Sequence, residues 1–363
     1  MKMNRIKVNA ENRSSLSSDR QWGTSLVLAW MVIFLTSCAG TPLIKDENGK
    51  KRPQSIASLE QIELLGKKQW ILLRGVNVDA PILLWLAGGP CGSEIGWTRK
   101  YLAPLENDVI FVNWDQPGAG KSYKAADFKQ IRVQNYVDAT IALSEYLAMR
   151  FKKEKIFLAG HSWGSIIGVM AAHQRPDLYY AYIGIGQQVN SVENDQIGYN
   201  MVLKQARQRG DHALVKKLEK NGLPPYTQAQ KGAYIDFFRH LPSCPPGICS
   251  KNSFWEMVKP KEYTLLDSLH TLKGLINGIN MVYPQLVDLD FERDVPQLDI
   301  PAFFVTGRYD YTCVQDIAYR YYAKLHAPLK RFYWLEKSGH NPCYQEPERF
   351  IQLLRDDILK LAE

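Results

Sequence analysis

Residues 155–170 read KIFLAGHSWGSIIGVM, and this stretch decides the fold. An apolar run precedes a Gly-x-Ser-x-Gly pentapeptide, and a second apolar run follows it directly. A strand that turns sharply into a helix holds the residue at the turn in a strained conformation, and the flanking Gly160 and Gly164 leave room for that turn. The pattern predicts that Ser162 stands exposed above a sheet as a nucleophile. The alternative is a serine in a purely structural turn.

Further apolar runs, alternating with helical patterns, surround this stretch. Two β-rich runs near the start, 57–65 and 68–74, meet at Gly66 and predict an antiparallel hairpin. Buried strands that alternate with helices form a mostly parallel sheet covered on both faces, so we expect an α/β fold. The remaining strands are expected at residues 82–86, 109–114, 156–159, 181–185, 302–305 and 331–335, and the helices at 136–151, 314–325 and 347–361.

The alternation stops in the middle of the chain. Between residues 187 and 296 only helical patterns are found, which predicts a helical cap inserted after the sixth strand as a lid over the site. The core is thereby divided into a first part, 54–186, and a second part, 297–363. Within the cap, helices are expected at residues 193–209, 211–220, 227–239 and 262–275.

The N-terminus is typical of a lipoprotein signal peptide, residues 1–37. A basic segment precedes ten apolar residues, 26–35, and small residues follow. The ending Leu-Thr-Ser-Cys resembles the bacterial lipobox, so Cys38 is the expected lipidation site and residues 38–53 a tether. An uncleaved anchor is the alternative, although spanning takes about 20 apolar residues. We therefore expect a membrane-anchored lipoprotein of the cell envelope, with its catalytic part periplasmic or extracellular.

The composition is that of a globular protein, with 45% hydrophobic and 23% charged residues among 363. The formal charge of +8 is spread along the chain without a basic block, which argues against nucleic acid as a partner. No spacing of cysteine and histidine matches a zinc site, so we expect no metal and no cofactor. Nothing in the sequence implies an obligate protein partner.

A serine nucleophile needs a base, and the base needs an orienting acid. In a fold with this kind of turn, the chain order is serine, acid, histidine. Asp310 follows the strand expected at 302–305, and His340 lies in the loop before the last helix. These two residues are therefore the expected acid and base. Asp316 is the main rival for the acid, and the alternatives are a turn aspartate and an ordinary loop histidine.

The oxyanion of a tetrahedral intermediate needs two backbone N–H donors. One is expected from Trp163, the residue after the nucleophile. The other is expected from the glycine loop after the strand 82–86, with Gly89 as the first choice and Gly88 as its competitor.

An oxidising compartment permits disulfides, which changes the interpretation of the cysteines. Cys244 and Cys249 enclose a Pro/Gly loop that a disulfide would close. Cys313 and Cys343 each follow a predicted catalytic residue by three positions, so we hypothesise that they bridge and link the acid loop to the base loop. Cys91 is left as a free thiol.

Three motifs resemble the α/β-hydrolase branch that contains the proline iminopeptidases: GGP at 88–90, NWDQPGAGKS at 113–122 and GHSWGS at 160–165. The similarity covers residues 59–361 and implies an α/β-hydrolase fold and serine hydrolysis through an acyl-enzyme. The chain departs from the family at three positions. Ala87 stands where the family has histidine, Cys91 where it has glycine, and Pro117 where it has arginine.

The resemblance implies an aminopeptidase of the proline iminopeptidase type that acts on short peptides. That family recognises the free α-amine with carboxylates of its lid, and the pair Trp255-Glu256 resembles one such pair. Glu256 is therefore a candidate for amine recognition, its alternative being a solvated helix glutamate. Two other functions stay open: a carboxylesterase or amidase for small acyl substrates, and a non-catalytic envelope binding protein.

Overall fold

A computed structural model describes residues 40–242 and 244–362 of the chain. The expected signal peptide and the expected lipidation site Cys38 lie outside these residues. Within the described part, no helix combines the length and the apolar character needed to cross a bilayer.

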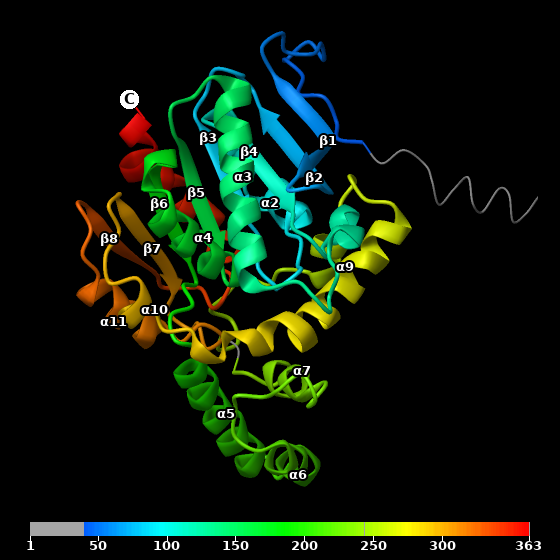
Figure 1. Ribbon diagram of the computed structural model, residues 1–363, viewed down its shortest axis with the longest axis vertical. Coiled ribbons are helices and arrows are strands. Elements are labelled where there is room, and N and C mark those ends of the chain that lie inside the picture. The colour runs from blue at the N-terminus through cyan, green and yellow to red at the C-terminus, as the bar shows by residue number, and fades with distance from the viewer. Residues whose placement is uncertain (1–39, 243, 363) are drawn as a thin grey trace, which may run out of the picture.

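A twisted sheet of eight strands forms the centre of the molecule, in the order β1-β2-β4-β3-β5-β6-β7-β8 (Figure 1). The first hairpin is antiparallel and joins β4 through β2, whereas β3 to β8 are parallel to one another. The predicted mostly parallel sheet is thus confirmed. The strands are β1 (Ile56–Leu64), β2 (Lys67–Gly75), β3 (Ile82–Leu86), β4 (Ile110–Asp115), β5 (Ile156–His161), β6 (Tyr179–Ile185), β7 (Ala302–Gly307) and β8 (Lys330–Leu335).

Both faces of the sheet are covered by helices because the central strands are apolar on both sides. Successive side chains of a strand point to opposite faces. Leu84 of β3 therefore packs in one core, while its neighbour Trp85 packs in another. The first core lies against α3 (Val133–Phe151), α4 (Trp163–Gln174) and α11 (Gln315–Lys324). The second lies against α2 (Ile95–Tyr101), α12 (Pro342–Gln345) and α13 (Pro347–Leu353).

Helices make up the segment between β6 and β7, which includes the expected cap and has its own small aromatic core. Figure 1 shows α5 and α6 extending away from the sheet, with α9 running beside it. The cap helices are α5 (Ser191–Gln208), α6 (His212–Asn221), α7 (Ala233–Phe238), α8 (Phe254–Val258), α9 (Leu265–Asn277) and α10 (Phe291–Asp294).

Two cap helices differ from the sequence prediction. The helix expected at 227–239 begins only at Ala233, because Gly232 before it adopts a left-handed conformation (φ 85°) and breaks the pattern. Helix α8 was not predicted, since five residues are too few to show helical periodicity. Between these two helices, Cys244 and Cys249 form a disulfide with their Cα atoms 6.0 Å apart.

Candidate active site

The turn from β5 to α4 holds Ser162 in a conformation that few residues adopt, with φ 53° and ψ −119°. Both glycines of the pentapeptide are needed for close packing. A Cβ at Gly160 would lie 2.3 Å from the carbonyl oxygen of Gly164, and one at Gly164 would lie 2.0 Å from that of Leu86. The turn at Ser162 therefore packs directly against the end of β3, and Ser162 lines a pocket.

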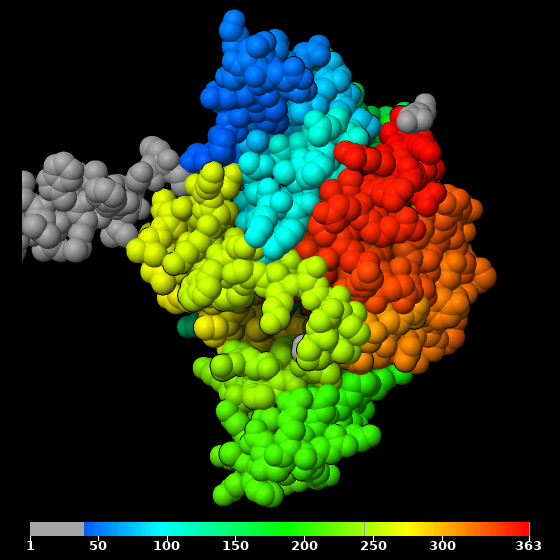
Figure 2. All heavy atoms as spheres, turned by 180° about the vertical axis from the view of Figure 1, so that it is seen from behind, coloured from blue at the N-terminus to red at the C-terminus, as the bar shows by residue number. Residues whose placement is uncertain are grey.

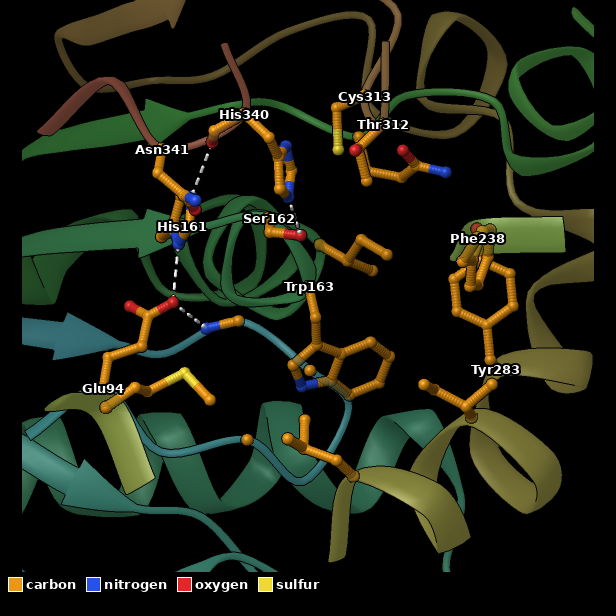
Figure 3. Close-up of a pocket in the computed structure, with 18 of the residues that line it drawn as sticks. Glu94, His161, Ser162, Trp163, Phe238, Tyr283, Thr312, Cys313, His340 and Asn341 are labelled. Atoms are coloured by element: carbon orange, nitrogen blue, oxygen red, sulfur yellow. Dashed lines mark hydrogen bonds and ion pairs between the residues drawn. The ribbon is translucent and has the colours of Figure 1, made fainter. Parts of the chain in front are cut away.

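The tertiary structure brings Ser162, His340 and Asp310 together. His340 Nε2 lies 2.9 Å from Ser162 Oγ (Figure 3). On the other side of the ring, His340 Nδ1 lies 3.0 Å from Asp310 Oδ2. The Asp310 side chain is fully buried, and its Oδ1 also accepts the backbone N–H groups of Thr312 and Cys313. These bonds fix the carboxylate so that it can orient the imidazole.

The rival acid, Asp316, lies on α11 and is exposed to solvent. Asp310 instead follows β7 directly. Its loop packs tightly against the loop of His340, because a Cβ at Gly307 would lie 2.1 Å from the carbonyl oxygen of Gly339. The contacts therefore favour Asp310 over Asp316 as the partner of His340.

Backbone donors for an oxyanion lie at two places beside Ser162. Trp163 begins α4, and the first N–H groups of a helix have no partner within the helix. The Gly88 N–H already donates to Glu94 Oε1 at 3.1 Å. Among the described residues, the N–H of Gly89 makes no hydrogen bond, so Gly89 and Trp163 remain the better candidates.

Glu94 and His161 form a buried pair behind Ser162 that the sequence did not reveal. His161 Nδ1 lies 2.6 Å from Glu94 Oε1, and His161 Nε2 lies 2.9 Å from the backbone carbonyl oxygen of His340. Glu94 also accepts hydrogen bonds from Trp85 Nε1 and the Tyr344 hydroxyl, both at 2.8 Å. The carboxylate thus fixes the glycine loop directly and the His340 loop through His161. These partners are distant in sequence, so no local pattern points to them.

The hydrogen bonds and the pKa shifts together bear on the charges of this pair. A carbonyl oxygen can only accept, so His161 Nε2 carries a hydrogen, while both oxygens of Glu94 accept from N–H or O–H donors. Burial opposes both charges, but each partner favours the charge of the other. The pKa of Glu94 is consequently lowered and the pKa of His161 is raised. Both shifts favour the ionised forms, a carboxylate on Glu94 and an imidazolium on His161.

The pocket above Ser162 has a volume of about 310 Å³ and apolar walls. Figure 3 shows Ser162 between His340 and Trp163, with Phe238 and Tyr283 on the opposite side. The cap contributes Phe238, Leu241, Met257, Leu275, Ile279 and Tyr283. No carboxylate from the described part of the cap is among the lining residues, and the one carboxylate that lines the pocket, Glu94, comes from the core.

Glu256 does not face the pocket. Its carboxylate pairs with Lys100 and accepts a hydrogen bond from the Tyr101 hydroxyl at 2.9 Å, on the outer side of α8. The neighbouring Met257 turns inward instead and lines the pocket. These contacts favour the alternative for Glu256, a solvated helix glutamate, because the short α8 presents this side chain to α2.

Cys313 and Cys343 do not form the disulfide that we hypothesised, since both are free and buried. The two loops do meet, but the side chains lie in different surroundings. Cys313 faces the pocket beside Ser162 (Figure 3), whereas Cys343 on α12 packs into the second core with Trp85. Burial raises the pKa of both thiols well above the ordinary range.

Cys91, the third free cysteine of the described residues, points away from the pocket. It adopts φ 61° next to the glycine loop, and its Sγ lies 3.0 Å from the Tyr136 hydroxyl in the first core. Burial raises the pKa of the Cys91 thiol to about 12. A thiol that stays protonated is a poor nucleophile, so Cys91 has a packing role.

The chain belongs to the alpha/beta hydrolase family, whose model matches residues 83–353. It is 31% identical over 307 residues to the probable aminopeptidase YbaC of Bacillus subtilis (strain 168), covering 83% of this chain and 96% of that protein. It is also 24% identical over 283 residues to a proline iminopeptidase of Heyndrickxia coagulans, covering 76% and 89%.

Solved structures share the fold. The proline iminopeptidase of Mycobacterium smegmatis superposes with a TM-score of 0.59 at 14% identity, covering 84% of this chain and 99% of that one. The protein is thus an alpha/beta hydrolase with relatives named as aminopeptidases and proline iminopeptidases.

Proposed function

We propose that the protein is a serine peptidase of the proline iminopeptidase type, which removes N-terminal residues from short peptides through an acyl-enzyme on Ser162. One observation carries the proposal: His340 Nε2 lies 2.9 Å from Ser162 Oγ, and its Nδ1 lies 3.0 Å from the buried Asp310. Such a chain of hydrogen bonds activates a serine hydroxyl. The relatives named as aminopeptidases support a peptide as the substrate.

In the proposed first step, His340 Nε2 takes the proton of Ser162 Oγ while that oxygen bonds to the substrate carbonyl carbon. The negative charge moves to the carbonyl oxygen, where the N–H groups of Trp163 and Gly89 would stabilise it. His340 then gives the proton to the leaving amine as the C–N bond breaks. A water molecule then attacks the acyl-enzyme, with His340 again as the base. This step releases the carboxylic acid and restores Ser162. Asp310 accepts a hydrogen bond from the Nδ1–H of His340 throughout and stabilises the imidazolium whenever it forms.

A second candidate is a carboxylesterase or amidase for small acyl groups. The lining of the pocket favours it, because the cap contributes apolar side chains and no carboxylate from its described residues. A buried ammonium without a charged partner is costly. Asp195 on α5 does not line the pocket, but it accepts a hydrogen bond at 3.0 Å from the hydroxyl of Tyr283, which does.

Hydrolysis of matched substrates by the full chain in detergent separates the two candidates. We would compare prolyl and alanyl p-nitroanilides with N-acetyl-prolyl p-nitroanilide and with short-chain p-nitrophenyl esters. Turnover confined to the free amines supports the aminopeptidase. Turnover of blocked anilides, or of esters alone, supports the second candidate.

Ser162→Ala provides the blank, and a fluorophosphonate probe counts active serines independently of substrate. If the wild-type protein neither reacts with the probe nor hydrolyses any of these substrates, both proposals fail and a non-catalytic binding protein is favoured.

A further inference from the structure

Helix α9 exposes several large apolar residues although its most deeply buried positions are small or polar. It buries Ser268, Thr271 and Gly274, and a Cβ at Gly274 would lie 2.1 Å from the carbonyl oxygen of Gly118. Its outer side carries apolar residues that a surface helix normally turns inward. Leu265, Leu266, Leu269 and Ile276 are 56%, 51%, 53% and 52% exposed. These residues share one side of the helix with the exposed Lys273, and exposed apolar residues gathered in this way mark an interaction surface.

Helix α8 extends this surface with two aromatic side chains. Phe254 is 46% and Trp255 59% exposed, and Lys259 Nζ lies 5.0 Å from the centre of the Trp255 ring. The two helices are in contact, and Figure 2 shows them side by side on one face of the molecule, in yellow-green and yellow. We call Phe254, Trp255, Leu265, Leu266, Leu269 and Ile276 the α8–α9 face.

Positive charge adjoins the α8–α9 face. A groove beside it is lined by Lys100, Lys259 and Lys261 together with Pro42. Lys100 is neutralised by Glu256, but Lys259 and Lys261 are exposed and take part in no ion pair of the described residues. Apolar and aromatic residues bordered by unpaired lysines are typical of surfaces that bind anionic lipid headgroups.

The start of the described chain lies at this groove. Thr41 Oγ1 donates to Glu262 Oε1 at 3.0 Å, in the linker between α8 and α9. In the sequence, the apolar run 26–35 ends six residues before Thr41. Six residues span at most about 20 Å of chain. A membrane that received this run or a lipid at Cys38 would therefore be held close to the α8–α9 face.

We propose that the α8–α9 face rests on the surface of a lipid bilayer that contains anionic lipids. Trp255, Phe254 and the α9 leucines would enter the boundary between headgroups and acyl chains, and Lys259 and Lys261 would contact phosphates. The same helices line the pocket with their inner sides, through Met257 and Leu275, so the docked face holds the pocket next to the membrane. This membrane contact is independent of which substrate is hydrolysed.

The test uses the full chain with an environment-sensitive fluorophore on Leu269→Cys. The matched control carries the same label on Met149→Cys of α3, which is 79% exposed and lies outside the α8–α9 face. Both proteins are placed in vesicles of phosphatidylethanolamine and phosphatidylglycerol, with and without brominated acyl chains. We expect a blue shift and quenching by brominated lipid at position 269 and neither at position 149.

Removing charge, either from the protein or from the lipid, supplies a second measurement. Each lysine near an anionic surface contributes a factor of roughly five, so Lys259→Gln with Lys261→Gln should lower the ratio of docked to undocked label about 25-fold. Replacing phosphatidylglycerol by a zwitterionic lipid should lower this ratio to a similar extent for the protein that keeps both lysines. Unchanged reaction of Ser162 with a fluorophosphonate shows that the variants are folded.

Three outcomes would overturn the proposal. The label at 269 could remain as solvated as the label at 149 in vesicles. It could be sheltered without vesicles in a concentration-dependent way, in which case a second copy of the chain covers the face. It could be sheltered without vesicles at every dilution, in which case residues 1–39 of the same chain cover it.

Discussion

Replacing Glu94 by glutamine tests whether the pair with His161 is ionic and supports the catalytic loops. Glutamine keeps the size of the side chain but removes its charge. Every hydrogen bond partner of Glu94 other than His161 is a donor, from Gly88, Trp85 and Tyr344. Whichever way the glutamine amide is turned, its NH2 group faces one N–H donor, from Gly88 or from Trp85, and leaves that donor without an acceptor. One buried unsatisfied donor costs about 1–3 kcal/mol of unfolding free energy.

A pH-dependent loss of unfolding free energy adds to this constant cost. In the wild-type protein the pKa of His161 is raised, so its stabilising contribution is complete below its unfolded pKa and is lost as the pH rises through the folded value. In Glu94→Gln the buried His161 loses its carboxylate, so its folded pKa falls below the unfolded value. The variant then loses stability as the pH falls below about 6.5, by about 1.4 kcal/mol per pH unit, or about 2 kcal/mol more at pH 5 than at pH 6.5.

Urea unfolding of both proteins at pH 5, 6, 7 and 8 measures this difference. The pKa of Glu94 is lowered, so its own contribution in the wild type is lost only below its ordinary range and does not affect the comparison. The rate of fluorophosphonate labelling reports the active-site loops at each pH, and Glu94→Asp tests for partial rescue. Parallel curves of unfolding free energy against pH would refute the ionic pair.

Three other predictions follow from single contacts. Asp310→Asn should lower kcat on the order of 10³ to 10⁴-fold, whereas Asp316→Asn on α11 should leave kcat unchanged. Steady-state kinetics measures both, and equal effects would contradict the assignment of the acid. Burial raises the pKa of Asp195 to about 7, so the folded state loses stability as the pH rises from about 4 to about 7. Asp195→Asn should therefore be more stable than the wild type at pH 8 and lose most of this advantage at pH 5, as measured by thermal unfolding. Cys91 and Cys343 should react with iodoacetamide at pH 8 only after denaturation, since both are buried in the cores and burial raises both thiol pKa values. Rapid modification of either in the native protein, located by peptide mapping, would show that the buried environment is wrong.

The order of strands and helices was predictable because it depends on local patterns. The glycines around Ser162, the apolar runs on both sides and the turn at Gly66 each restrict the backbone within a few residues. Helix α8 and the late start of α7 were not predicted, since a five-residue helix has no detectable period and a left-handed glycine overrides the pattern around it.

Sequence also selected Ser162, Asp310 and His340, because chain order in this fold limits the choice, and the structure places them within hydrogen-bond distance. Spacing could not decide where side chains point. Cys313 and Cys343 lie on loops that meet, yet the backbone turns one thiol toward the pocket and the other into the core.

The sequence by itself thus determined the fold and the candidate nucleophile, acid and base, because these follow from local periodicity and strained turns. Only the tertiary structure decided the apolar pocket, the Glu94–His161 pair and the outward leucines of α9. Each of these depends on contacts between residues far apart in the chain, and no local pattern records which of two opposite faces will be buried.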